Sequence, residues 1–316
     1  MYYICNYFES GDLMPLNKFE VITNAEMYYN AFSSHLDKPF NHIDTVYLFT
    51  NENVPFILEN SNLDGKLLTV TASFDQALNA ALLGVKDITM FDINKIAKYF
   101  AELKKTAIEK LTYADFLKLY NLKETPFGKF KINYSKNIDS QIVQRLCQDM
   151  DYYYALFFEK LFELGFFDKK NQGYYYSFVC NPNHNLYLRK EKFYELKNIL
   201  QDVIFNEYID CNLFDIKKYI GKEKFSTVLL SNITSYFDQE ELKKFNILLH
   251  QMEDNLIDNG IIQIGLGNLK NSGIIDGSCA IDRKFVDKNK DKIKEIKIKE
   301  ETITYYHKTR RKNGKY

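Results

Sequence analysis

Between residues 67 and 111, the spacing of hydrophobic and polar positions predicts a strand, a buried helix and a second strand. Residues 67–71 are apolar and β-branched without polar alternation, which is typical of a strand buried on both faces of a parallel sheet. Residues 76–83 are apolar nearly all round, so we expect a buried helix that Asp75 caps and Gly84 ends. Residues 88–91 form a second apolar, strand-like run.

Asp92 follows the second strand, and another helical pattern follows Asp92. From residue 94 to 111 apolar positions recur at helical spacing with Lys and Glu between them, which predicts a helix that covers the sheet. Strand, tight turn, buried helix, strand and terminal carboxylate make a βαβ unit of about 30 residues, with the acid about 20 residues after the first turn. This is the arrangement of a nucleoside-binding half of a Rossmann-type sheet.

The second half of the chain predicts the rest of this sheet. We expect a helix at about 191–201 and strands at 208–211, 225–230 and 261–264, followed by an antiparallel terminal pair around Ile296, Ile298 and Ile303. Asp238 and Glu241 have capping-box spacing for a helix over 239–258 that Asn259-Gly260 would close.

Two segments lie outside this pattern. Residues 1–66 are expected to be mainly helical, at 26–32 and 53–58, and to act as a lid. Residues 112–190 interrupt the sheet with an aromatic-rich insertion, in which we expect helices at 113–120 and 140–164. Because insertions on such sheets lie over the open crevice, the insertion would carry acceptor specificity; alternatively its aromatics form only a small core of their own. The predicted sheet domain is therefore 67–111 together with 191–316.

Composition narrows the function classes. The chain has 316 residues and a formal net charge of zero, which gives no support to general nucleic-acid binding. The five cysteines are odd in number and contain no C-x-x-C, so neither a disulfide framework nor a zinc ribbon is indicated, and a reducing cytoplasm is the simplest setting. We expect no signal peptide and no membrane span, because no run approaches about 18 uninterrupted apolar residues.

Asp92 is the leading candidate for ligand binding. A carboxylate at the carboxyl end of a parallel strand can accept hydrogen bonds from both hydroxyls of a ribose. The alternative is that Asp92 only caps the following helix.

The first turn, at residues 71–75, indicates which cofactor fits. A dinucleotide site needs G-x-G-x-x-G, but this turn has no glycine, and Asp75 stands where an anion would lie. A pyrophosphate would be repelled, which argues against NAD and FAD. S-adenosylmethionine fits better, because it carries a sulfonium and an ammonium and has no phosphate.

Further candidates follow the later strands and precede the first one. Asn212 could hydrogen-bond the adenine amine while Leu213 packs on the ring, and Ser231 with Asn232 would face the group that is transferred. Glu52 could meet the ligand's amino group or cation from a lid, or the Thr50–Asn53 letters could be a plain helix cap.

Three other features have simpler interpretations. Residues 180–184 contain Cys180 and His184 but lack a second ligand pair, so we interpret them as a turn, with His184 as a minor general-base candidate. Gly265-Leu266-Gly267 follows the last parallel strand and is interpreted as a turn rather than a nucleotide loop. The basic residues from Lys308 to Lys315 form a solvated end or give a weak attraction to anionic lipid surfaces.

Several motifs together resemble one protein family. They are Thr50-Asn51-Glu52-Asn53, the run Thr71 to Asn79, Phe91-Asp92-Ile93-Asn94, the helix from Leu103 to Leu111, Tyr113, Phe116-Leu117 and Leu230-Ser231-Asn232-Ile233. They are similar to motifs of the S-adenosylmethionine-dependent proteins related to the diacylglycerol 3-amino-3-carboxypropyltransferase of betaine-lipid synthesis. The resemblance covers about 47–120 and 225–236. It departs at Phe74, where the family usually has glycine.

The resemblance implies a fold, an activity and a set of site residues. The fold would be α/β, a Rossmann-like, class I methyltransferase-type sheet that is mainly parallel and covered by helices on both faces. The activity would be transfer of a 3-amino-3-carboxypropyl group to a small-molecule or lipid acceptor, with S-adenosylmethionine-dependent methyl transfer or nonenzymatic nucleoside binding as alternatives. Asp92, Ile93 and Glu52 would bind the cofactor, and Ser73, Phe74 and Asp75 would lie near its methionine portion. Asn212 and Leu213 lie outside the resemblance and are adenine-binding candidates from their place after the third strand alone. Ser231 and Asn232 would be catalytic.

Overall fold

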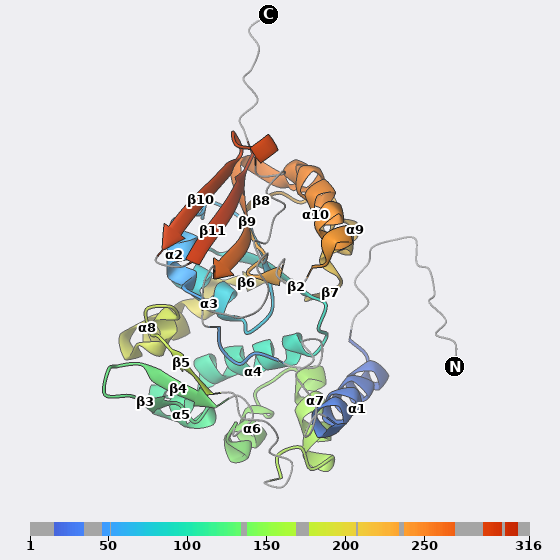
Figure 1. Cartoon of the computed structure of the whole chain (residues 1–316). Helices are drawn as coiled ribbons and strands as arrows, with labels where there is room; N and C mark the ends of the chain where they lie inside the picture. The colour runs from blue at the N-terminus through green and yellow to red at the C-terminus, as the bar shows by residue number, and fades with distance from the viewer. Residues whose placement is uncertain are drawn as a thin grey trace, which may run out of the picture.

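The computed structural model describes residues 16–34, 46–50, 52–133, 138–168, 177–206, 208–233, 237–268, 287–298 and 301–308. Figure 1 shows a large sheet with helices on both sides and, at the opposite end from the carboxyl terminus, a group of helices around a smaller sheet. Two of the five cysteines, Cys5 and Cys279, lie outside the described residues, as do Asn51 of the Thr50–Asn53 motif and the basic residues after Lys308.

The large sheet is mainly parallel. Its order is β10 (Ile293–Ile298), β11 (Glu301–His307), β9 (Leu256–Asn268), β8 (Phe225–Leu229), β1 (Leu67–Val70), β2 (Asp87–Asp92) and β6 (Ile204–Phe205), and β7 (Ile209–Asp210) also pairs with β2. Strands β1, β2, β6, β7, β8 and β9 pair in parallel, whereas β11 runs antiparallel to both β9 and β10. The mainly parallel α/β sheet and the antiparallel terminal pair are therefore confirmed.

The strands β1 and β2 are buried on both faces because each face meets a different set of helices. Leu67 lies in a core with α3 (Asp75–Leu82), α4 (Ala97–Lys110) and α8 (Lys190–Ile199). Leu68, on the opposite face, lies in a second core with α9 (Ile216–Ile220) and α10 (Gln239–Met252). Every residue of α3 is buried, as its sequence pattern predicts. Figure 1 shows α9 and α10 together on one side of the sheet.

Among the described residues, five short helical elements connect or extend the longer elements. They are α2 (Val54–Glu59), η3 (Leu186–Leu188), η4 (Leu200–Asp202), η5 (Leu213–Asp215) and η7 (Glu253–Asn255). Within the described residues, no helix has the length and apolar character needed to cross a membrane.

The insertion contains more than the predicted helices. Its elements are α5 (Tyr113–Leu119), α6 (Ser140–Leu146), α7 (Tyr152–Glu163) and a small antiparallel sheet of β3 (Lys123–Glu124), β4 (Phe130–Asn133) and β5 (Ser177–Cys180). The predicted single helix over 140–164 is wrong, because the chain turns between α6 and α7. The insertion packs on α4, where Phe157 stacks on Tyr99 with ring centroids 4.0 Å apart, and α7 also packs along α1 (Lys18–Ser34) (Figure 1).

Three further predictions from the sequence need correction. The helix that starts at the confirmed Asp238–Glu241 capping box ends at Met252, and Asn259-Gly260 lies inside β9 instead of closing that helix. Gly265-Leu266-Gly267 is also part of β9, paired with residues 302–304 of β11, and is not a turn. The third strand is split into β6 and β7, and both parts pair with β2.

Position 260 of β9 has room only for glycine. A Cβ atom at this position would lie 2.8 Å from the Leu256 Cβ and 2.9 Å from the Ile257 backbone oxygen. The neighbouring Asn259 has a φ of 63°, and the β8–β9 register shifts between Phe225 and Thr227. The Asn-Gly pair therefore forms an irregularity within a strand rather than a helix end.

Candidate functional site

A cavity of about 630 Å³ opens at the carboxyl ends of β1, β2, β7 and β8. Most of the lining comes from the ends of these strands and from the segments that follow them: Val70, Ala72, Ser73, Gln76, Phe91, Asp92, Ile93, Asn94, Ala97, Cys211, Asn212, Leu213, Leu230, Ser231, Asn232 and Ile233. The segment before α2 supplies Val46, Tyr47, Phe49, Thr50 and Glu52. Phe237 and Glu241 complete the lining. Of the ten residues predicted from the sequence to form the site, eight line this cavity; Phe74 and Asp75 do not.

The first turn is built from unusual backbone conformations. Ala72 and Phe74 have φ values of 40° and 69°, and the Phe74 amide donates a 2.6 Å hydrogen bond to the Thr71 carbonyl. Such left-handed conformations favour glycine, because a residue with a Cβ atom is strained in them. Phe74, and not Asp75, is the residue before α3, and no side chain caps that helix, so the predicted Asp75 cap is wrong.

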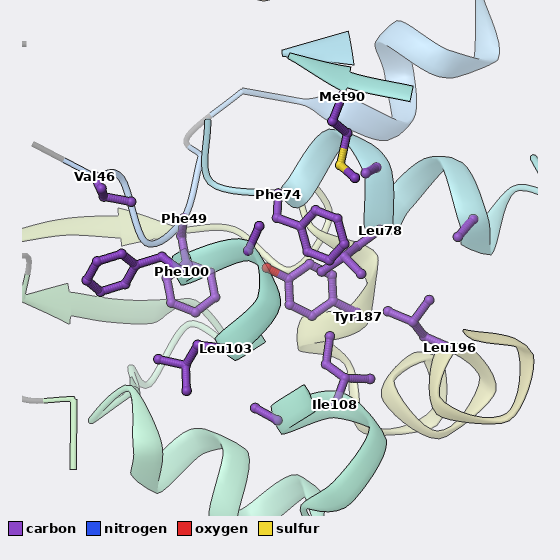
Figure 2. Packing of buried hydrophobic residues seen from close by; sticks show 14 of the residues in the cluster. Val46, Phe49, Phe74, Leu78, Met90, Phe100, Leu103, Ile108, Tyr187 and Leu196 are labelled. Atoms are coloured by element: carbon purple, nitrogen blue, oxygen red, sulfur yellow. The ribbon is translucent and has the colours of Figure 1, made fainter. Parts of the chain in front are cut away.

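The Phe74 ring points into the core and not into the cavity. The side chain is fully buried, its ring lies 5.2 Å from the Phe205 ring, and Figure 2 shows it above Leu78 and Tyr187. The structure therefore puts this ring away from the space that a ligand would occupy.

Asp92 joins the first turn to the end of β2. Its Oδ2 accepts a 2.8 Å hydrogen bond from the Ala72 amide, and its Oδ1 accepts a 2.9 Å hydrogen bond from the Asn94 amide. Burial raises the Asp92 pKa above its ordinary value, partly opposed by these two amides and reinforced by the nearby charge of Asp210. Asp92 is not the cap of α4, which begins at Ala97 after Ile96.

Asn212 and Leu213 border the cavity beyond β7. The Asn212 Oδ1 accepts a 3.0 Å hydrogen bond from the Phe214 amide and so starts the η5 turn, while Leu213 is buried beside it. The neighbouring Cys211, which the sequence did not single out, also lines the cavity, and burial raises the pKa of its thiol to about 12. Cys211 is therefore a neutral wall residue at physiological pH.

Glu52 borders the cavity on the side opposite to Asn212 and Leu213, and two side chains hold its carboxylate in place. Its Oε2 accepts a 3.1 Å hydrogen bond from the Gln76 side-chain amide, and its Oε1 accepts one from the Ser231 hydroxyl. The cap of α2 is the next residue, Asn53, whose Oδ1 accepts from the Phe56 amide. The helix-cap interpretation of this motif is therefore confirmed for Asn53, whereas contact of Glu52 with a ligand stays a prediction.

Ser231 is fixed by a residue that the sequence did not reveal. Ser231 has a φ of 54°, its amide donates to Gln263 Oε1 at 2.9 Å, and its carbonyl accepts from Gln263 Nε2 at 3.2 Å. The sequence does contain a sign that Gln263 has a special role, because it is the one polar residue in the otherwise apolar run of residues 261–264. Its buried amide satisfies both backbone groups of Ser231 and aims the hydroxyl at Glu52.

Asp75 lies behind the first turn in a buried polar cluster. Its carboxylate accepts hydrogen bonds from Lys104 Nζ at 2.7 Å, the Thr50 amide at 2.5 Å and the Tyr187 hydroxyl. Lys104 also donates to the carbonyls of Ser73, at 2.6 Å, and Leu48. This cluster fastens the segment before α2 to the first turn, and so sets the distance between two walls of the cavity.

The charge of the cavity wall is one-sided. Glu52, Asp92 and Glu241 contribute three carboxylates, and no Lys, Arg or His belongs to the lining formed by the described residues. Such a wall attracts cationic ligands and repels phosphates.

Other predicted features lie elsewhere. His184 is in a turn, as expected, but does not line the cavity, and neither does any described residue of 112–190. The described helices of the insertion pack on α4 and α8. Among the residues whose positions are described, no group of three or more His, Cys, Asp or Glu side chains could hold a metal ion.

Comparisons with known proteins give a likeness in structure only. No family model matches this chain, and no curated protein sequence does. Two solved structures, at 2.4 and 1.5 Å, of the rRNA methyltransferase aviRa from Streptomyces viridochromogenes are similar, with TM-scores of 0.40 and 0.41 and sequence identities of 10% and 11%. Each alignment covers 87% of this chain and 92% of the aviRa chain, and the likeness concerns the fold alone.

Proposed function

We propose that the cavity binds S-adenosylmethionine and that the protein is a transferase that uses it. The observation that carries this proposal is the acidic cavity at the carboxyl ends of β1, β2, β7 and β8. In open α/β sheets, ligands bind at such ends where the strand order reverses, here between β1 and β8.

The sheet order supports one orientation of the ligand. Asp92 would hold the ribose, and Asn212 with Leu213 would contact the adenine, because β7 pairs with β2. Ser231, at the end of β8, lies on the other side of β1 and would face the transferred group and its acceptor. A sulfonium compound without phosphate suits the three carboxylates of the lining, whereas the pyrophosphate of NAD or FAD does not.

The transferred group is proposed to be 3-amino-3-carboxypropyl. The acceptor's nucleophile would attack the carbon of the methionine chain next to sulfur, the carbon–sulfur bond would break, and 5′-methylthioadenosine would leave. Alignment of the nucleophile within about 3–3.5 Å supplies most of the acceleration, so little acid-base chemistry is required. The motif resemblance supports this choice, and the buried Phe74 ring removes a steric objection to it.

The binding step is tested by calorimetry with S-adenosylmethionine and S-adenosylhomocysteine. Asp92→Ala should weaken binding by about 1.5–3 kcal/mol, because it removes a charged acceptor from the ribose hydroxyls. Asp64→Asn, an exposed carboxylate in the turn before β1, is the matched control and should bind normally. A loss below about 1 kcal/mol for a folded Asp92→Ala protein would contradict the ribose role.

The by-product identifies which group moves. Incubation with S-adenosylmethionine and fractionated cell extract should release 5′-methylthioadenosine, measured by mass spectrometry. Accumulation of S-adenosylhomocysteine instead would indicate methyl transfer. Tight binding with neither product at any acceptor concentration would indicate a nonenzymatic binding protein.

A further inference from the structure

Two buried polar atoms of cavity-lining residues have no hydrogen-bond partner within the described residues. They are Ser73 Oγ and Gln76 Oε1, on side chains that are 4% and 3% exposed. Leaving such an atom unsatisfied costs about 1–3 kcal/mol. Two of them, on cavity-lining residues three positions apart, indicate a binding partner that the described residues do not supply.

Gln76 adjoins a carboxylate that is already held in place, and Ser73 lines the same cavity. The amide nitrogen of Gln76 donates to Glu52 Oε2, so the unsatisfied oxygen of the same amide lies next to Glu52. The Ser231 hydroxyl donates to the other oxygen of Glu52, and Gln263 fixes Ser231 in turn. The carboxylate therefore does not depend on the ligand for its position.

The three groups define the chemistry of what they bind. A carboxylate, an amide oxygen and a hydroxyl oxygen are three acceptors, one of which carries a full charge. A primary ammonium has three N–H donors and one positive charge, and hydrogen bonds between charged partners are the strong ones. A carboxylate or phosphate at the same place would be repelled by Glu52.

We infer that Glu52, Ser73 and Gln76 form a subsite for a primary ammonium group. This inference rests on the proposed function for the identity of the ligand, since S-adenosylmethionine carries such an ammonium on its methionine portion. The subsite anchors the methionine end of the ligand, while Asp92 holds its adenosine end.

Three ligands that share the adenosine part test the subsite by calorimetry. The first is 5′-methylthioadenosine. In the second, a 3-aminopropyl group replaces the methyl group on sulfur, which adds an ammonium without a carboxylate. In the third, a 3-carboxypropyl group replaces that methyl group, which adds a carboxylate without an ammonium. The wild-type protein should bind the aminopropyl ligand about tenfold or more tightly than methylthioadenosine. Glu52→Gln should lose that gain, bind methylthioadenosine within about twofold of wild type, and bind the carboxypropyl ligand more tightly than wild type does. Glu59→Gln, an exposed change on the adjacent α2, should behave as wild type.

Ser73→Ala provides a second variant that separates binding from folding. It should weaken aminopropyl binding about threefold or more, while the unfolding midpoint of the ligand-free protein stays unchanged or rises, because an unsatisfied hydroxyl is removed. A purely structural role for Ser73 would lower that midpoint.

The outcomes distinguish this inference from the proposed function. If wild type binds methylthioadenosine but gains nothing from the aminopropyl group, or if Glu52→Gln weakens all three ligands alike, the ammonium subsite is overturned and the adenosine site stands. If wild type binds none of the ligands, both proposals fail.

Discussion

Phe74 combines a strained backbone with a well-packed ring. Its φ of 69° is a conformation that costs a residue with a Cβ roughly 1–2 kcal/mol relative to an ordinary one. Its fully buried ring fills the core between α3 and the β2–β6 edge and lies next to Tyr187 in Figure 2. Packing of the ring thus offsets the strain of a turn that glycine would form freely.

We therefore expect Phe74→Ala to damage stability and not ligand affinity. The loss of the ring should reduce the free energy of unfolding by about 3–5 kcal/mol, measured by urea denaturation. Affinity of the folded variant for S-adenosylmethionine should remain within about twofold of wild type, because the ring does not line the cavity. Phe127→Ala, at an 88% exposed position, is the control and should change neither quantity. A tenfold loss of affinity in folded Phe74→Ala protein would show that the ring contacts the ligand.

The position of Asp92 could be predicted from the sequence, and the contacts of Asp75 could not. Asp92 follows a strand with an unambiguous apolar pattern, and the end of such a strand has a known place in a parallel sheet. Asp75 is bound by Lys104 and Tyr187, which are far from it in the chain. Periodicity shows that Lys104 is on a helix, but not that this helix turns it inward to meet a buried carboxylate.

At the scale of elements, Glu253 connects the terminal hairpin to the end of α10. Its carboxylate accepts from the Tyr306 hydroxyl, from Lys292 Nζ at 2.9 Å and from His250 at 3.3 Å. Burial alone would raise the Glu253 pKa, but these hydrogen bonds outweigh it and lower the pKa below 4.5. A lowered folded-state pKa means that the carboxylate stabilises the fold above its unfolded pKa, and that this contribution disappears as pH falls through the folded value.

Glu253→Gln should accordingly show a pH-dependent loss of stability. Above about pH 5 we expect the variant to be less stable than wild type by about 1–2 kcal/mol, because the side chain is partly exposed and only charged hydrogen bonds are lost. The difference should shrink as pH falls through the lowered folded-state pKa of wild-type Glu253, because the carboxylate then becomes protonated. Urea denaturation from pH 3 to 7 measures it, with Glu59→Gln as the control for removal of an exposed carboxylate. A difference that is constant across this range would contradict the assignment.

Element ends were less predictable than element types. The capping box at Asp238 and Glu241 has a local cause and was predicted correctly. The end of α10 was not, because Leu256 and Ile257 continue an apolar pattern that suits either a helix or a strand. Pairing of Leu256 with Phe225 of β8 decides for the strand, and that partner is remote in sequence.

At the scale of the whole molecule, the sheet could be predicted, whereas the contacts between the insertion and the sheet's helices could not. The sequence pattern of each βαβ unit lies within one continuous segment. The parallel pairing of its strands and the right-handed connection between them follow from general rules. The insertion is positioned by contacts such as Tyr99 with Phe157, which join two helices through aromatic rings. Because Phe and Tyr are common throughout this chain, composition did not show which rings meet. The two-residue strand β3 was missed because it is too short to have a period.

The central position of β1 has a consequence for how the protein acquires its site. Leu67 pairs with Ile88 on one side and with Thr227 on the other, and the whole insertion lies between these two partners along the chain. Pairings between such distant residues form slowly, because a long loop must close before the contact is gained. During synthesis the β1–β2 half emerges first, while the wall containing Ser231 must await β8. The cavity wall is thus complete only after β8 has joined β1 in the sheet.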